Sequence, residues 1–600
     1  MIENLNNLER THSCGALRTE NVGERVTLMG WCARRRDFGP LTFIDLRDRD
    51  GITQIVVNQE KAPEAHAKAK DVRGEYVLAV RGEVVLREEG ARNPKLATGD
   101  VEVQTTEIRV LNDARTLPFQ LDASETALAA EDLRLKYRYL DLRRPQLQAN
   151  LRLRHRMILE INRYMDEHGF TQIETPNLIK STPEGARDYV VPSRVQPGKF
   201  FALPQSPQIF KQICMIAGLD KYYQIARCFR DEDLRADRQP EFSQLDVEMS
   251  FATPEQVYKL VEGLFARIFR LIDVELQTPF PRLTFADAMR RFGSDKPDLR
   301  IPAELQDLSE ALAETTFAPY ASVLSAKGEI KGLVVSGGAS MSRKALDELQ
   351  DFAKRYGATA LAWIKLGDEM TSSLLKVLGH DKVVDLAGLA GAQKGDAVLI
   401  VAGKPDVVAA SLGALRNEVA KREGSIPEGV YAPLWVTEFP MFEYHEDDGR
   451  YYAMHHPFTS PLDEDVPVLE RAVNGERELF GQLRAKAYDA VINGVEVAGG
   501  SIRIHRSDVQ SLVFKALGMT EEQARARFGF FLEALTYGTP PHGGIASGIE
   551  RTLMVLVPTE NIREVMAFPK TASAQDLMID APGEVDQKQL EELHLKIVND

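Results

Sequence analysis

The chain has 600 residues, of which 44% are apolar and 27% are charged. This length exceeds what one hydrophobic core usually organises, so we expect three or four domains. No segment is long and apolar enough to cross a bilayer, so we expect neither a transmembrane segment nor a membrane partner. The first fifteen residues lack the apolar core of a signal peptide. We therefore expect a cytoplasmic protein.

The net charge of −15 argues against a nucleic-acid partner for the molecule as a whole, but binding depends on where the basic residues lie. The cysteines are scattered along the chain without a CxxC pair. This pattern predicts buried thiols, with neither a zinc site nor a disulfide framework. The four cysteines are Cys14, Cys32, Cys214 and Cys228.

The segment from Thr27 to about Val110 predicts a small β-barrel of the OB type, with about five short strands and a helical stretch from Ala62 to Val72. Phe43 and Gln54 lie on neighbouring predicted strands. An aromatic side chain among arginines suits single-stranded nucleic acid, whose bases stack and whose phosphates need counter-charge. A solvated barrel edge explains the segment equally well. The arginines concerned are Arg34, Arg35, Arg36, Arg47, Arg49, Arg81, Arg87 and Arg92.

Two apolar, β-prone runs, Tyr222 to Phe229 and Glu241 to Phe251, flank a charged, turn-prone loop. This arrangement predicts an antiparallel hairpin with its charges at the open end. The loop is either a solvated tip, which is the usual case for such a segment, or it grips a charged ligand.

The chain around this hairpin predicts a domain of helices and strands that a second domain interrupts. A helix ends at Gly169, and a strand that follows it is broken by Pro176, which indicates an edge or an interface. Another helix opens at Pro207. After residues 285–297, about 135 residues with their own helices, strands and glycine turns predict an inserted α+β domain. The earlier pattern resumes at Ala432.

Three places offer charges to a polyphosphate. The hairpin supplies Arg230, strand-like sequence carries Asp489 and Glu496 seven residues apart, and Arg551 follows a Gly-rich turn at the start of an apolar helix. Carboxylates for magnesium and guanidiniums for phosphates are what magnesium–ATP chemistry requires. No P-loop motif occurs. Each place taken alone is more often structural than functional.

His455 and His456 suggest a metal site at first sight. Neighbouring residues on a strand point to opposite faces, so we do not expect them to ligate one ion together. A second polar cluster lies where a predicted strand meets a helix, and it predicts a pocket rim, although its lysine is equally consistent with an ordinary surface position. Its members are Gln205, Ser206, Gln208 and Lys211.

Taken together, these stretches resemble the class II aminoacyl-tRNA synthetases, and closely their bacterial aspartyl type, over nearly the whole chain. GFTQIETPNL is similar to motif 1 of that class, FRDEDLRADRQPEFSQLD to motif 2, and GIERTLMVL to motif 3. The aspartyl type is further indicated by LKYRYLDLRRP, TPEGARDY, LPQSPQ, MHHPFTSP and YDAVINGVEVAGGSIRIH. The ordered set of motifs is far more specific than any one of them.

The resemblance implies a multidomain α/β protein with three kinds of domain. These are an N-terminal OB-fold β-barrel, a class II catalytic domain built on an antiparallel sheet, and an inserted α+β domain of the bacterial GAD type. The expected boundaries are residues 1–112 for the anticodon-binding barrel, 113–135 for a hinge, 136–287 and 431–570 for the two parts of the catalytic domain, 288–430 for the insertion and 571–600 for a C-terminal extension.

The resemblance also assigns an ATP site. Arg230 would contact the α-phosphate, with Glu232 beside the ATP, and Phe242 would stack on adenine opposite Arg551. Arg230, Glu232 and Arg551 are therefore the expected catalytic residues. The residues expected to bind ATP are Arg230, Asp231, Glu232, Gln239, Phe242, Glu496, Gly548, Ile549, Glu550 and Arg551, and those expected to bind Mg²⁺ are Asp489 and Glu496.

An aspartate pocket follows from the same resemblance. Lys211 and Arg503 would offer two cations to one side-chain carboxylate, and asparagine would leave that positive charge unpaired, so its rejection should be strong. Gln244 and Asp246 would hold the α-ammonium group. The residues expected to enclose aspartate are Glu184, Ser206, Gln208, Lys211, Arg230, Gln244, Asp246, His455 and Arg503, with His456 in the same pocket.

In the barrel, two positions bear on which tRNA is charged. Phe38 and Gly90 resemble positions that separate enzymes restricted to the aspartate tRNA from relaxed ones that also charge the asparagine tRNA. Gly90 favours the relaxed type and Phe38 matches neither pattern, so both possibilities stay open. The positions that match anticodon-reading residues are Arg36, Phe43, Gln54 and Glu102.

The sequence departs from the family pattern in motif 3. It reads GIER where GLDR is more usual, and Ser547 stands where an aromatic residue is common. Arg551 is intact, so we expect activity to survive these changes.

The implied function is aspartate–tRNA ligation. ATP and Mg²⁺ would convert L-aspartate to its adenylate, and tRNA(Asp), with tRNA(Asn) left open, would accept the aspartyl group on its 3′-terminal adenosine. A homodimer through motif 1 is expected. Two alternatives remain: an enzyme like asparaginyl-tRNA synthetase, which typically lacks the large insertion, and a non-catalytic RNA-binding relative, which tends to lose the arginines and carboxylates present here.

Overall fold

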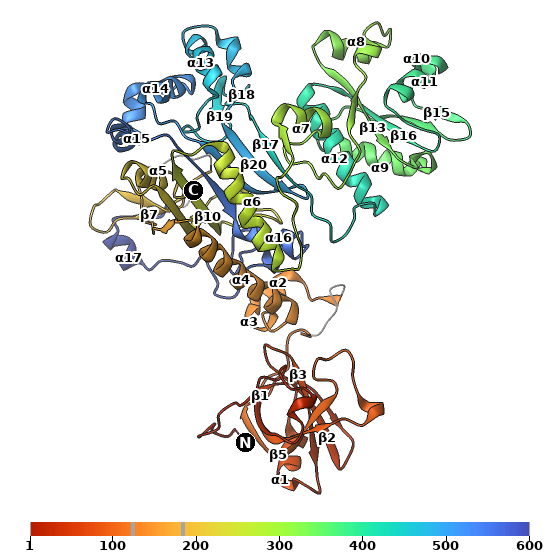
Figure 1. Cartoon of the computed structure of the whole chain (residues 1–600), viewed down its shortest axis with the longest axis vertical. Coiled ribbons are helices and arrows are strands. Elements are labelled where there is room, and N and C mark those ends of the chain that lie inside the picture. Colours follow the sequence, from red (N-terminus) through yellow and green to blue (C-terminus); the bar gives the residue numbers. More distant parts are fainter. Residues whose placement is uncertain (1, 122–126, 182–185, 599–600) are drawn as a thin grey trace. The chain divides into compact units, whose positions relative to one another are not determined.

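The computed structural model describes residues 2–121, 127–181 and 186–598, and the chain divides into two compact units (Figure 1). The first comprises Met1–Arg152 with Ala567–Thr571 and Gln575–Pro582, and the second comprises Leu153–Met566 with Ala572–Ala574 and Gly583–Asp600. None of the described helices is long and apolar enough to span a membrane. The finer domain boundaries given above remain predictions.

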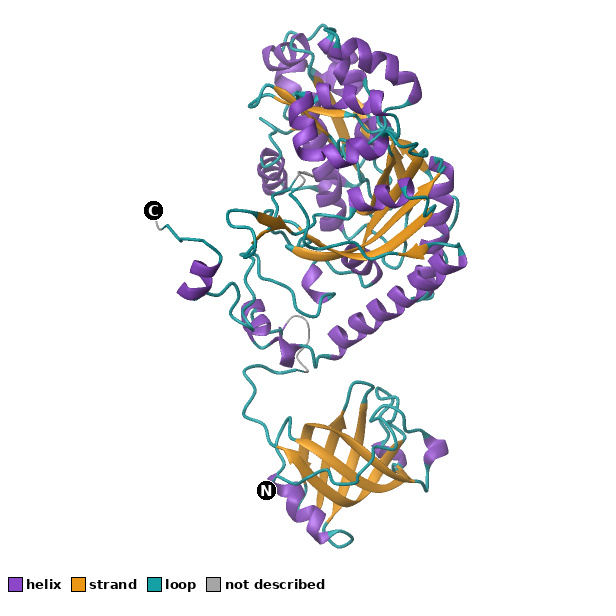
Figure 2. Cartoon of the chain, turned by 90° about the vertical axis from the view of Figure 1, so that its left-hand side faces the viewer, coloured by secondary structure: helices purple, strands orange, loops and turns teal. Residues whose placement is uncertain are grey.

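The first unit contains a closed five-stranded barrel, which confirms the predicted OB fold (Figure 2). Its strands follow one another around the barrel in the order β1-β2-β3-β5-β4. Side chains alternate along β2, with Ile44 and Leu46 buried inside, because successive residues of a strand point to opposite faces. The strands are β1 (Arg25–Asp37), β2 (Leu41–Arg47), β3 (Ile52–Asn58), β4 (Val77–Leu86) and β5 (Val101–Asn112), with helix α1 (Pro63–Asp71) between β3 and β4.

The second unit is built on an eight-stranded sheet in the order β11-β17-β20-β21-β22-β10-β9-β6. All neighbouring strands are antiparallel except the two outermost pairs, β11 with β17 and β6 with β9. This topology confirms the expected antiparallel catalytic sheet. The strands are β6 (Thr171–Gln172), β9 (Lys221–Phe229), β10 (Glu241–Ser250), β11 (Arg282–Thr284), β17 (Pro433–Thr437), β20 (Ala487–Ile492), β21 (Val495–Ile502) and β22 (His542–Gly548).

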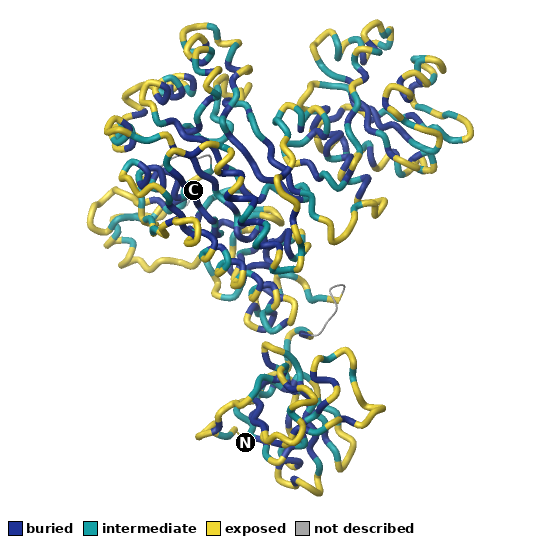
Figure 3. Tube along the Cα trace, in the orientation of Figure 1, coloured by how far each residue is buried: buried dark blue, intermediate teal, exposed yellow. Residues whose placement is uncertain are grey.

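Three helices cover one face of this sheet and bury its largest apolar core (Figure 3). They are α4 (Pro145–Glu167), α6 (Pro254–Arg270) and α16 (Ile549–Leu556). Met157 and Ile161 of α4, Phe265 of α6 and Leu553 of α16 are each at most 1% exposed. Thr253 caps α6 in a capping box with Gln256, which explains why the helix starts there.

The predicted charged hairpin is confirmed as β9 and β10, whose register pairs Cys228 with Phe242. The strand expected to be broken by Pro176 is shorter than predicted. β6 ends at Gln172, so the proline lies beyond it and β6 forms the edge of the sheet. Proline has no N–H to donate to a ladder, which is consistent with the strand ending before it.

The insertion has its own five-stranded antiparallel sheet, in the order β12-β13-β16-β14-β15. Helices α9 and α12 pack on one face, and α8 and α11 on the other, so two apolar clusters make it the predicted α+β layer structure. The elements are β12 (Leu305–Asp307), β13 (Glu329–Val335), β14 (Ala362–Leu366), β15 (Met370–Ser372), β16 (Ala397–Gly403), α8 (Ala318–Ser325), α9 (Arg343–Lys354), α10 (Leu375–Leu378), α11 (His380–Leu389) and α12 (Pro405–Glu423).

The remaining helices and strands lie outside the barrel and the two large sheets. They are α2 (Glu131–Lys136), α3 (Arg138–Asp141), α5 (Gln208–Ile216), α7 (Phe285–Phe292), α13 (Val466–Val473), α14 (Ser507–Ala516), α15 (Glu521–Leu535), α17 (Gln587–Glu592) and the two-stranded ribbons β7 (Val190–Pro192) with β8 (Phe200–Ala202) and β18 (Phe442–His445) with β19 (Arg450–Ala453). The four cysteines are buried, as predicted.

Candidate active site

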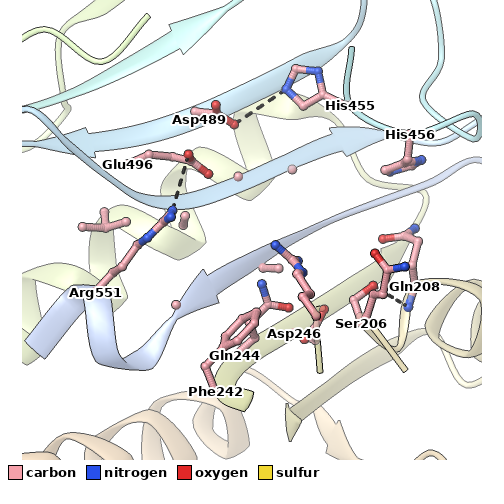
Figure 4. A pocket seen from close by; sticks show the side chains of 18 of the residues that line it. Ser206, Gln208, Phe242, Gln244, Asp246, His455, His456, Asp489, Glu496 and Arg551 are labelled. Carbon is pink, nitrogen blue, oxygen red and sulfur yellow. Dashed lines mark hydrogen bonds and ion pairs between the residues drawn. The ribbon is translucent and has the colours of Figure 1, made fainter. Parts of the chain in front are cut away.

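A cavity of about 600 Å³ opens over strands β10, β21 and β22 of the second unit (Figure 4). It gathers most of the residues expected to bind ATP and aspartate, although they come from segments that are hundreds of residues apart. Asp231 and Ile549 do not line it, and Glu184 lies outside the described residues. The expected residues that do line it are Ser206, Gln208, Lys211, Arg230, Glu232, Gln239, Phe242, Gln244, Asp246, His455, His456, Asp489, Glu496, Arg503, Gly548, Glu550 and Arg551.

Arginines and an aromatic ring mark one end of the cavity. The guanidinium of Arg230 lies 5.1 Å from the ring centroid of Phe242, a cation–π distance. Arg551 stands in the first turn of α16, directly after β22, and its guanidinium is 3.6 Å from Glu496 and 3.8 Å from Asp237. This end therefore presents positive charge and a π-face, which suits a nucleotide.

Asp489 and Glu496 meet above Gly499 on neighbouring strands β20 and β21. A Cβ at Gly499 would lie 2.7 Å from Asp489 Oδ1 and 3.4 Å from Glu496 Oε1, so the two carboxylates converge on a space that only glycine leaves open. Burial, reinforced by Glu496, holds the pKa of Asp489 well above its usual range. A cation would relieve this cost. Two oxygen-ligand side chains beside a phosphate site fit Mg²⁺, which keeps several of its ligands as water or phosphate.

The opposite end of the cavity contains four buried charges that alternate in sign. Lys211 Nζ lies 2.9 Å from Asp246 Oδ1 and 3.7 Å from Glu248 Oε2. Arg503 donates two hydrogen bonds to the Glu248 carboxylate, of 2.9 and 3.2 Å. All four side chains are at most 2% exposed. Two cations and two carboxylates thus compensate one another in a site that excludes water.

The environment shifts the pKa values of Asp246 and Glu248 in opposite directions. Burial raises the pKa of Asp246, although Lys211 opposes the shift. Burial would also raise the pKa of Glu248, but Arg503 and Lys211 outweigh it and bring that pKa below its ordinary value. Asp246 lines the cavity, and its Oδ2 is buried and accepts no hydrogen bond from the described residues, so this oxygen has unused capacity to accept one.

Glu248 is a site residue that the sequence analysis missed. A signal existed: Gln244, Asp246 and Glu248 are spaced by two along β10, and residues with that period share one face of a strand. Asp295, in the loop that follows α7, lines the cavity and was missed as well, whereas Glu248 lies behind the lining residues Lys211 and Arg503. No pattern in its surroundings pointed to the pocket.

The two histidines do not stand on a strand, so the expectation of opposite faces is wrong. They follow β19 in a turn, and both line the cavity. His456 Nε2 lies 2.7 Å from Arg503 Nη1, and burial with Arg503 lowers the pKa of His455 to about 4 and that of His456 well below its ordinary value. Both imidazoles are therefore uncharged at neutral pH, and His456 takes part in hydrogen bonding. Among the described residues, no group of three or more His, Cys, Asp and Glu could hold a metal.

Two ATP-site candidates have other partners. Asp231 accepts an ion pair from Arg187 at 3.5 Å. The carboxylate of Glu550 is engaged at both oxygens, by Arg154 at 2.9 Å and by the backbone amide of Ser243 at 3.0 Å.

The barrel brings its four anticodon candidates together on one face. Arg36 donates to Gln54 at 3.2 Å, and Gln54 donates to Glu102 at 2.8 Å. Phe43 lies on β2, directly opposite Arg36 of β1 in the strand register. Phe38 meets Phe43 edge to face at 5.7 Å and is 66% exposed. Two of the barrel arginines expected to offer charge to a nucleic acid have partners within the barrel unit. Arg87 is buried and donates to the Val101 carbonyl, and Arg47 forms an ion pair with Glu75. Gly90 has open space around it.

Comparison with known proteins agrees with this geometry. Residues 130–572 match the family described as class II tRNA synthetases (D, K and N), and residues 26–111 match an OB-fold nucleic acid binding domain. The chain is 51% identical over 598 residues to the aspartate–tRNA(Asp/Asn) ligase of Halothermothrix orenii, with 100% of both chains covered. It is 51% identical over 594 residues to the aspartate–tRNA ligase of Geobacillus kaustophilus, covering 98% of this chain and 99% of that one.

Solved structures share the fold. The asparaginyl-tRNA synthetase of Pyrococcus horikoshii, in complex with asparaginyl-adenylate, matches with a TM-score of 0.59 and 19% identity, over 94% of this chain and 98% of that chain. At that identity the likeness concerns architecture alone. The 51% identity to aspartate–tRNA ligases over the full length, together with the family match, shows more than architecture. The chain belongs to the class II aminoacyl-tRNA synthetases, among the aminoacyl-tRNA ligases of the aspartate–tRNA ligase branch.

Proposed function

We propose that the chain activates L-aspartate with ATP and transfers the aspartyl group to tRNA(Asp) and tRNA(Asn). The observation that carries the proposal is the buried cluster of Lys211, Asp246, Glu248 and Arg503 at one end of a cavity whose other end presents Arg230. One end is complementary to a small zwitterion and the other to a nucleotide.

The amino-acid end supports aspartate in particular. Lys211 and Arg503 would offer donors to the side-chain carboxylate, while Oδ2 of Asp246, which accepts no hydrogen bond from the described residues, would accept one from the α-ammonium group. Asparagine lacks the negative charge, so it would leave a buried cation less well paired than aspartate does. The pocket therefore favours aspartate over its amide.

The nucleotide end needs no side-chain nucleophile. Arg230 would hold the α-phosphate while a carboxylate oxygen of aspartate attacks the α-phosphorus, forming aspartyl-adenylate and releasing pyrophosphate. Positioning the two reactants and neutralising developing charge carry the step. The 3′-hydroxyl of the tRNA's terminal adenosine then attacks the adenylate carbonyl, and AMP leaves.

Asp489 and Glu496 would hold Mg²⁺, because their carboxylates converge over Gly499. The ion supplies charge neutralisation to the polyphosphate. Arg551, 3.6 Å from Glu496, would remain beside the adenine and phosphates. ATP and magnesium thus share one set of charged side chains.

The tRNA partner and the assembly are further parts of the proposal. The barrel face of Arg36, Phe43, Gln54 and Glu102 would read the anticodon, since stacking and hydrogen bonding suit unpaired bases. Several full-length relatives are named aspartate–tRNA(Asp/Asn) ligases, which supports the relaxed specificity that Gly90 favours over the restricted one. The proposal also includes a homodimer, formed through the motif 1 segment around edge strand β6, and a cytoplasmic location.

ATP–pyrophosphate exchange tests the activation step. We expect exchange with aspartate and not with asparagine, and absence of exchange with every amino acid would overturn the proposal. Arg230→Ala should lower aspartate-dependent exchange by about a hundredfold or more, because a charge-stabilising donor is lost. The variant should keep its far-UV circular dichroism and its dimer mass. Near-normal exchange would remove Arg230 from the assigned role.

A further inference from the structure

A hydrogen bond links the two sides of the proposed adenine slot. The backbone N–H of Ser243 on β10 donates to Glu550 Oε2 on α16 at 3.0 Å. Ser243 directly follows Phe242, and Glu550 directly precedes Arg551. The bond therefore joins the backbone next to the aromatic ring to the backbone next to the arginine, and it fixes how far apart the two can lie.

This hydrogen bond depends on a buried carboxylate. Glu550 is 2% exposed, and a charge so far from water requires a counter-charge. Arg154 supplies it from α4: its Nη2 donates to Glu550 Oε1 at 2.9 Å and to Ser243 Oγ at 3.1 Å. Arg227 donates to the same hydroxyl at 3.2 Å. One guanidinium thus contacts both members of the link.

We propose that Arg154 is a positioning residue for ATP, which sets the width of the adenine slot by holding Glu550 against the Ser243 amide. It does not line the cavity itself and acts through Glu550. The inference rests on the proposed function, in that ATP occupies the end of the cavity near Phe242 and Arg551. It also gives Glu550 a part that its expected role in ATP binding did not describe.

Loss of Arg154 would act on one substrate. Without its counter-charge the buried Glu550 carboxylate would turn toward water, which weakens its bond to the Ser243 amide. Phe242 and Arg551 would then lose their fixed separation. The aspartate pocket is held by a separate set of bonds among Lys211 and its partners, none of which includes Arg154.

The experiment compares the full-length Arg154→Met variant with the wild type. Binding of a non-hydrolysable ATP analogue with Mg²⁺ is measured by calorimetry, and the KM values for ATP and aspartate are measured by pyrophosphate exchange. We expect analogue affinity to fall on the order of tenfold and the KM for ATP to rise in proportion, since small displacements of positioning groups are costly. The KM for aspartate should stay within about twofold of the wild-type value.

The matched control is Arg163→Met on the same helix. Arg163 is 70% exposed, and its ion pair with Glu160 is long, at 3.8 Å. Its loss should therefore leave analogue binding unchanged. Arg154→Lys, which keeps the charge but offers a single donor group in place of the guanidinium fork, should lie between wild type and Arg154→Met. It also serves if the methionine variant fails to fold.

A double variant separates the proposed link from general damage. In Arg154→Met with Glu550→Gln the amide still accepts from the Ser243 N–H, and no buried charge is left unpaired. Analogue affinity should therefore recover above that of Arg154→Met alone. Equal analogue affinity in the Arg154→Met and Arg163→Met variants, an equal loss for aspartate and ATP, or no recovery in the double variant would each overturn the inference. Wild-type enzyme without aspartate-dependent exchange would instead refute the proposed function.

Discussion

Lys211 and Arg503 carry the two positive charges of the proposed aspartate pocket, and neither side chain is more than 2% exposed. From the residues alone, Lys211 was equally consistent with an ordinary surface position. That alternative is wrong, because the side chain is buried. Its burial is tolerable only because Asp246 and Glu248 lie beside it. At this scale the charge balance of single side chains decides what the pocket can accept.

Glu248→Gln tests that balance. Glu248 orients Arg503 through two hydrogen bonds, so its loss leaves the guanidinium free to turn and one buried cation poorly paired. We expect the KM for aspartate in pyrophosphate exchange to rise by about ten- to a hundredfold, with a smaller effect on the KM for ATP. Glu255→Gln, which removes an exposed partner of Arg282, is the control. An unchanged KM for aspartate would show that Glu248 does not orient Arg503.

His456 predicts how stability depends on pH. Burial holds its folded-state pKa well below the value of about 6.5 expected when the chain is unfolded. The unfolded chain therefore binds the proton more readily below that pH, and the stability that neutral His456 contributes is lost as the pH falls. The Tm of the wild type should drop more between pH 7.5 and 5.5 than that of His456→Gln. His445→Gln, at an exposed position, should follow the wild type. Identical slopes in all three proteins would contradict the assignment.

Strand β10 shows, at the scale of elements, how far the sequence could be interpreted. The hairpin of β9 and β10 was predictable because its alternation and charged loop are local features. That Gln244, Asp246 and Glu248 share the cavity face was implicit in the same period of two. What faces them could not be predicted, because Lys211, Arg503 and His456 arrive from distant segments. The turn that carries His456 looked like a strand for the same reason, since local pattern alone does not reveal tertiary contacts.

Gly499→Ala tests the junction of β20 and β21. The added Cβ would lie 2.7 Å from Asp489 Oδ1 and would push the two carboxylates apart. We expect the Mg²⁺ concentration for half-maximal exchange to rise by roughly tenfold, because Mg²⁺ demands near-ideal ligand geometry. Gly388→Ala, which meets open space on α11 of the insertion, should have no such effect. A normal magnesium requirement in Gly499→Ala would place the metal elsewhere.

The whole molecule assigns its two proposed recognition tasks to different compact units, with the barrel in one and the catalytic sheet in the other. The family and the antiparallel-sheet fold followed from the ordered motifs, because their spacing along the chain is specific even where each motif is weak. The exact domain boundaries remain predictions, because linkers make few contacts that would constrain their sequence. Since the residues proposed for activation all belong to the second unit, we expect anticodon reading to be separable from activation.

Arg36→Ala tests this separation. Arg36 contacts Asp45 and Gln54 on the barrel face, so its loss should weaken charging of tRNA by about five- to a hundredfold through the KM for tRNA. Aspartate-dependent pyrophosphate exchange without tRNA should be unchanged. Arg81→Ala, on β4 and paired with Glu107, is the control for a general loss of positive charge. Equal effects of both variants on charging would mean that Arg36 contributes charge and no base recognition.

Transfer of labelled aspartate to purified tRNA(Asp) and tRNA(Asn), assayed side by side with ATP and Mg²⁺, tests the central claim most directly. The claim is that this cavity makes aspartyl-adenylate and passes the aspartyl group to tRNA. We predict that both tRNAs become aspartylated, and that asparagine is transferred to neither. Failure to aspartylate tRNA(Asp) would contradict the account.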